Sequence, residues 1–129
     1  MINHRFQMSR EDSQTYINSE ILKKIPTTKE RFMLLMALGY NNHLYITVGG
    51  ESVFIDIGFN DEDLALIYAV AIKTKEKIEN INSTYELLEI ANSYANGGLH
   101  FIEYLENNMA EDQFKYLEKE FFNHISNLE

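Results

Sequence analysis

Nine consecutive apolar residues, at positions 64–72, constrain the fold of this chain more than any other feature. A buried strand can have this composition, but the run contains three alanines and follows Asn60 and three acidic residues. Side-chain oxygens and negative charges are favoured at the start of a helix, where backbone N–H groups lack partners. We therefore expect residues 64–72 to form a central, occluded helix around which the remaining elements pack.

Capping and helix-breaking residues divide the rest of the chain. Pro26 ends a first helix, because it lacks an N–H group and disfavours helical geometry at the residue before it. Thr27 lies three residues before Glu30, which is the spacing of a capping box, and it begins the next helix. Ser83 and Glu86 repeat this spacing further along the chain.

Glycine and asparagine residues are expected to end two of the helices. Gly97 and Gly98, preceded by Asn96, can adopt the left-handed conformation that is common after a helix. Gly39, or the Asn-Asn pair at 41–42, has the same role earlier in the chain. The helices predicted from these signals lie at residues 19–25, 27–39, 60–77, 83–95, 99–105 and 108–128.

A β-hairpin is predicted at about residues 44–57. Residues 44–48 and 53–57 are rich in β-branched and aromatic side chains, and a Gly-Gly-Glu-Ser turn lies between them. Residues 1–18 are polar and weakly patterned, so we expect an N-terminal arm or irregular segment there. The predicted fold is mainly α: a compact bundle of five or six helices with one small hairpin, in a single helical domain over residues 19–129.

Charge is unevenly distributed along the 129 residues, which carry a net charge of −9. Residues 1–50 contain six basic and four acidic side chains, whereas residues 51–129 contain five basic and sixteen acidic ones. A chain this acidic repels phosphate, which disfavours direct nucleic-acid binding by the chain alone. A small DNA-binding regulator that uses the positive N-terminal third is the alternative.

No motif of a known catalytic or metal site is present. Cysteine is absent, which excludes disulfides, thiolate metal sites and cysteine nucleophiles. The four histidines have no metal-ligand spacing. A hydrolase or nuclease that uses Asp56, Asp61 and Asp63 with a divalent ion is a third alternative. We expect no catalytic residue, no cofactor and no metal. No segment has the length and apolarity of a membrane span. We expect a cytoplasmic protein.

The aromatic content points to contact with another chain. Eight tyrosines and eight phenylalanines are more than one small core can take, so some of them are expected on a surface that meets a partner or a second copy. The partner-contact residues that we predict are Tyr94, Asn96, Gly97, Gly98, Tyr116 and Phe122.

Three blocks of sequence, at residues 28–40, 61–69 and 89–99, resemble a known family. The last block, Glu-Ile-Ala-Asn-Ser-Tyr-Ala-Asn-Gly-Gly-Leu, is the most specific. Together they are similar to the small type 4 proteins associated with bacterial DNA phosphorothioation (dnd) gene clusters, over about residues 27–105. The family pattern has basic residues after the first block, where this chain has Asn41, Asn42 and His43.

The resemblance implies a role in a bacterial defence or DNA-modification cluster and carries over no catalytic residue. We expect a non-catalytic accessory or adaptor subunit of an antiphage defence or phosphorothioation-associated complex. It would act through protein–protein contacts with a larger subunit of the same cluster, and a homo-oligomer is a further expectation.

Overall fold

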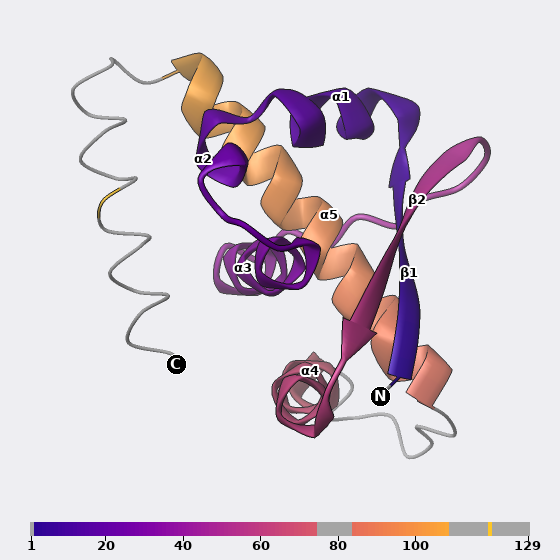
Figure 1. Ribbon diagram of the computed structural model, residues 1–129. Helices are drawn as coiled ribbons and strands as arrows, with labels where there is room; N and C mark the ends of the chain where they lie inside the picture. The colour runs from indigo at the N-terminus through magenta and orange to yellow at the C-terminus, as the bar shows by residue number, and fades with distance from the viewer. Residues whose placement is uncertain (1, 75–83, 109–118, 120–129) are drawn as a thin grey trace.

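The computed structural model describes residues 2–74, 84–108 and 119, and these residues form two strands and five helices (Figure 1). The mainly helical expectation is confirmed. The predicted Ser83 cap, and the predicted last helix beyond residue 108, lie outside the described residues apart from Lys119. The elements are β1 (Ile2–Ser9), α1 (Arg10–Asn18), α2 (Glu20–Lys23), α3 (Thr28–Asn41), β2 (Ser52–Phe59), α4 (Asp61–Thr74) and α5 (Thr84–Asn108).

The two strands form an antiparallel sheet whose register runs from Ile2 opposite Phe59 to Ser9 opposite Ser52. The hairpin predicted at 44–57 is therefore wrong in its first strand, since residues 44–48 form no strand. They lie along α5 instead, where the Ile46 N–H donates to the Ser93 carbonyl oxygen at 3.0 Å.

The N-terminal segment, expected as an arm or irregular chain, is a strand followed by a helix. Alternate side chains of β1, namely His4, Phe6 and Met8, are buried, which is the period-two pattern of a strand with one inward face. Phe6 and Phe59 both pack on Phe32 of α3, with ring centroids 5.1 and 5.4 Å apart. Burial of these apolar rings holds the sheet on the helices.

The helix beginning at Thr27 is confirmed, because the Thr27 hydroxyl accepts from the Glu30 N–H at 3.1 Å. The helix ends at Asn41, two residues after Gly39. The residue that adopts the left-handed conformation after the helix is His43, with a φ of 56°. Asn60 and Asp63 cap α4 reciprocally: each side chain accepts from the backbone N–H of the other at 2.9 Å. The predicted start of α4 is therefore confirmed.

The predicted break at Asn96, Gly97 and Gly98 is wrong, because α5 runs without interruption through 25 residues. The glycines serve close packing. A Cβ atom on Gly98 would collide with the Leu35 carbonyl oxygen of α3, and one on Gly39 would collide with the Tyr94 carbonyl oxygen of α5. The absence of side chains at this crossing lets the two helix backbones touch.

The expectation that α4 is the central, occluded helix is also wrong. Leu64, Ile67 and Ala71 are buried, but Leu66 is 52% exposed and Ile72 is 54% exposed. One face of α4 packs on the rest of the molecule, and the other face of the apolar run meets solvent. The central element is α5, which runs diagonally through the fold, with α1 and α2 towards one end and α4 towards the other (Figure 1).

Candidate protein-interaction surface

Three of the predicted partner-contact residues lie inside the molecule. Asn96, Gly97 and Gly98 are buried on α5, so they present no surface to a partner in this fold. Tyr94 is half-buried, with its hydroxyl 2.8 Å from the Thr74 hydroxyl of α4. Its ring packs edge-on against Tyr40 and Tyr45. The other two predicted residues, Tyr116 and Phe122, lie outside the described residues.

Asn96 and its neighbour one turn earlier, Asn92, join α5 to the strand β1. The Asn92 side chain accepts from the Gln7 N–H at 2.9 Å and donates to the Gln7 carbonyl oxygen at 3.1 Å. Asn96 Nδ2 donates to the same carbonyl oxygen at 2.8 Å. At Gln7 these amides supply the bonds that a third strand would supply, and α5 thereby covers the outer edge of β1 at this residue. Two asparagines four residues apart on an apolar helix face are the signal that sequence reasoning missed.

The ring of His4 belongs to this buried structure. Its Nε2 lies 3.2 Å from Asn92 Oδ1, and the rings of Phe32 and Phe59 lie beside it. Burial lowers the pKa of His4, while the bond to Asn92 and the nearby Glu89 carboxylate act in the opposite direction. The net lowering disfavours the charged ring. His4 is therefore a structural residue of the interior.

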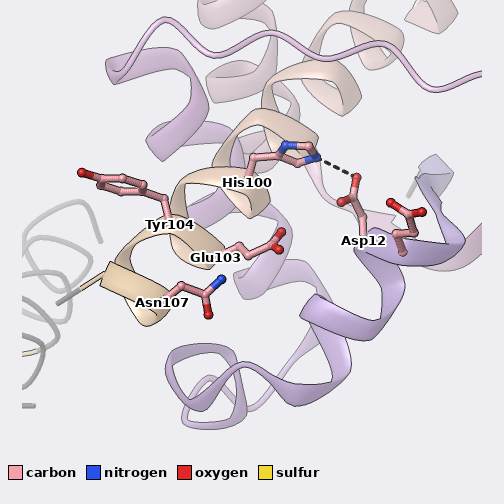
Figure 2. A pocket seen from close by; sticks show the side chains of 6 residues that line it. Asp12, His100, Glu103, Tyr104 and Asn107 are labelled. Atoms are coloured by element: carbon pink, nitrogen blue, oxygen red, sulfur yellow. Dashed lines mark hydrogen bonds and ion pairs between the residues drawn. The ribbon is translucent and has the colours of Figure 1, made fainter. Parts of the chain in front are cut away.

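A small acidic pocket of about 420 Å³ lies between α1 and α5 (Figure 2). In Figure 2 the His100 ring points at Asp12, with Nε2 3.0 Å from Oδ2, while Tyr104 extends away from this pair. The pocket is lined by Glu11, Asp12, His100, Glu103, Tyr104 and Asn107. Its carboxylates suit a cationic group, but within the described part of the chain no three or more histidine or acidic side chains converge as a metal site does.

The acidic residues of the metal-dependent hydrolase alternative do not gather either. Asp56 on β2 pairs with Arg5 at 3.7 Å. Asp63 caps α4 and also pairs with Lys29 at 3.3 Å. Asp61 lies in the first turn of α4 and is exposed. The separate partners explain Asp56 and Asp63 without a shared ion.

Three of the six basic residues of the positive N-terminal third pair with acids from the next part of the chain. Arg5 and Lys29 have the partners just described, and Arg10 pairs with Glu51 at 3.4 Å. Arg31 donates to the Ile25 carbonyl oxygen at 2.8 Å. Exposed ion pairs stabilise a fold only slightly, but they cancel the local positive field that phosphate would need. The arrangement therefore gives the DNA-binding alternative no support.

In the part of the chain that the structure describes, the outer face of α4 is an exposed apolar surface with helical spacing. Ala65, Leu66, Ala69 and Ile72 lie on the solvent side of this helix, and we call them the α4 stripe. The exposed residues Asp61 and Glu62 lie at its N-terminal end. A row of apolar side chains three and four residues apart is the pattern by which a helix binds an apolar groove of another protein.

None of the helices described here combines the length and apolarity needed to cross a membrane. Comparison of the chain with protein-family models, with curated proteins and with solved structures finds no match in any of the three.

Proposed function

We propose that this protein is a non-catalytic accessory subunit that binds a larger protein through the α4 stripe. The observation that carries the proposal is the half-exposed state of Leu66 and Ile72 on a helix that is capped and anchored on its other face. The similarity of residues 27–105 to small proteins of DNA phosphorothioation clusters supports a cytoplasmic antiphage defence or DNA-modification complex as its setting.

The geometry of α4 suits a helix-in-groove contact. Ala65 and Ala69 are small, so a partner surface can approach the helix closely, while Leu66 and Ile72 are the larger side chains available to fill pockets. Burying a fully exposed leucine or isoleucine side chain contributes about 1.5–3 kcal/mol, and roughly half of this remains to be gained at Leu66 and Ile72, which are 52% and 54% exposed. The two side chains together can therefore supply a substantial part of a binding free energy.

Charge helps to define the partner. The net charge of −9 repels nucleic acid and favours a protein surface with basic residues around its apolar groove. Asp61 and Glu62, at the start of α4, are exposed and positioned to meet such residues. The partner we expect is a basic protein, as is common for a subunit that handles DNA.

The test is co-expression with the proteins encoded by neighbouring genes, followed by size-exclusion chromatography and a binding titration. The double variant Leu66→Lys/Ile72→Lys should lose binding by about a hundredfold, as expected when two anchor side chains are replaced by charges. Ile17→Lys is the matched control, since Ile17 is an exposed apolar residue on α1 and away from the α4 stripe. Its complex should survive.

Two outcomes would overturn the proposal. One is that no larger neighbour binds the wild-type chain. The other is that the double variant binds as tightly as the control while both retain the wild-type Tm and circular dichroism spectrum.

A further inference from the structure

The outer edge of β2 has backbone groups available for another strand. Gln7 of β1 lies opposite Phe54 of β2, yet its N–H and carbonyl oxygen bond to Asn92 on α5. In an antiparallel pair of strands, the backbone N–H and C=O groups of two opposed residues either bond to each other or all point away from the partner strand. The N–H and carbonyl oxygen of Phe54 therefore point outward from β2, and those of Ser52 and Asp56, two residues away, do the same.

These groups are unpaired within the part of the chain that the structure describes. No backbone hydrogen bond from a loop, cap or other element reaches Ser52, Phe54 or Asp56. The two edges of the sheet thus differ near their centres, because α5 bonds to Gln7 of β1, whereas no described element bonds to the backbone of Ser52, Phe54 or Asp56 of β2. An unpaired strand edge is a ready template for a strand of another chain.

We infer that a second copy of this protein pairs with the edge, with the two β2 strands antiparallel and Phe54 opposite Phe54 of the second copy. In this register each Ser52 lies opposite an Asp56, so a hydroxyl faces a carboxylate. Phe54 is 46% exposed and would gain an aromatic neighbour across the new pair. A shift that brought Asp56 opposite Asp56 would place like charges together, which is destabilising.

The local charges permit this pairing despite the net charge of −9. Beside the edge, Arg5 pairs with Asp56 and lies 4.6 Å above the ring of Phe54. Arg10 pairs with Glu51 at the start of the strand. In each of these two ion pairs a positive charge offsets a negative one beside the edge. The product is a four-stranded sheet, and sheets of more than two strands are the stable ones.

Cysteine scanning tests the register directly, because the natural chain contains no cysteine. Opposed Cα atoms in a bonded antiparallel pair lie about 5.5 Å apart, within the range of a disulfide. Phe54→Cys should therefore cross-link to itself under mild oxidation. Asp56→Cys should not, since the residue opposite it is Ser52. A mixture of Ser52→Cys and Asp56→Cys should give the mixed dimer.

A proline variant provides a second measurement by light scattering. Phe54→Pro removes the outward N–H and leaves the bonds between β1 and β2 in place, so it should turn a dimer into a monomer with Tm little changed. Ser52→Asp places a carboxylate opposite Asp56 of the second copy, and this repulsion should weaken the dimer. Ser52→Lys places a positive charge opposite the same Asp56 and should strengthen the dimer.

The inference is overturned if Phe54→Cys does not cross-link, or if Asp56→Cys alone cross-links equally well. A wild-type chain that is monomeric at every concentration also overturns it and leaves the edge to a strand of a different protein. These results are separate from the proposed function, because Leu66→Lys/Ile72→Lys should leave the cross-link unchanged.

Discussion

The crossing of α3 with α5 and the outer face of α4 are both rich in apolar residues, yet they have opposite environments. At the crossing, Gly39 and Gly98 bring two helix backbones into contact. On α4 the run of nine apolar residues is only partly covered, since Leu66 and Ile72 are about half exposed to solvent. The difference shows that the central helix of this fold is the one whose backbone can contact another helix closely. The number of apolar residues in a helix does not by itself identify it.

Replacement of a crossing glycine should have the largest effect on stability. Gly98→Ala places a methyl group against the Leu35 carbonyl oxygen, and the helices must separate to accept it. We expect a loss of about 3 kcal/mol or more in the free energy of unfolding, measured by urea denaturation. Gly49→Ala is the control, since nothing lies within 4 Å of a Cβ there. Equal stability of the two variants would show that the crossing is not tight.

Loss of the Asn92 amide should have the next largest effect. Asn92→Leu leaves the Gln7 N–H without its partner and removes the acceptor of the His4 ring. We expect a loss of about 2–3 kcal/mol, because an unsatisfied buried donor costs its full desolvation. Asn107→Leu, at an exposed position of the same helix, should change stability by less than about 0.5 kcal/mol. A neutral Asn92→Leu would contradict the role of α5 as a cover for β1.

The buried His4 should make stability fall in acid. Burial lowers the pKa of His4 in the folded protein, so below the unfolded pKa of about 6.5 the unfolded chain binds a proton that the folded chain does not. The free energy of unfolding should therefore be fully retained above about pH 6.5 and decrease below it. His4→Gln should flatten this decrease, as measured by Tm from pH 8 to pH 5.

The smallest effect is expected on the outer face of α4. Leu66→Ala should change the free energy of unfolding by less than about 0.5 kcal/mol, since the side chain is half in water already. Its neighbour Ile67 is fully buried, and Ile67→Ala should cost about 3 kcal/mol. Similar losses for the two variants would mean that the α4 stripe contributes to folding and is not reserved for a partner.

Local signals in the sequence predicted the starts of two helices, α3 and α4, but not the helix α1 or the continuity of α5. The caps at Thr27 and Asn60 depend on a few neighbouring residues, and both form as expected. The strand β1 was missed although His4, Phe6 and Met8 alternate, because a histidine occupies one of the inward positions and interrupts the row of apolar side chains. Its partner, β2, lies more than forty residues away, and pairing over that separation depends on the tertiary fold.

The candidate site was harder to predict for a physical reason. A Gly-Gly pair such as Gly97-Gly98 can end a helix or allow another backbone to approach, and only the packed structure distinguishes the two. An apolar run such as 64–72 likewise does not reveal which face will be covered. Three of the predicted partner-contact residues, Asn96, Gly97 and Gly98, are therefore buried, whereas an exposed apolar face of the described residues lies on α4.

Amide hydrogen exchange, measured on the free chain and on its complex with a larger neighbour, tests most directly whether α4 is the binding surface. We predict that amides of α4 (Asp61–Thr74) exchange about tenfold or more slowly in the complex, while those at the buried crossing of α3 and α5 are unchanged. Slowing confined to the pocket between Asp12 and His100, with α4 unaffected, would contradict the account.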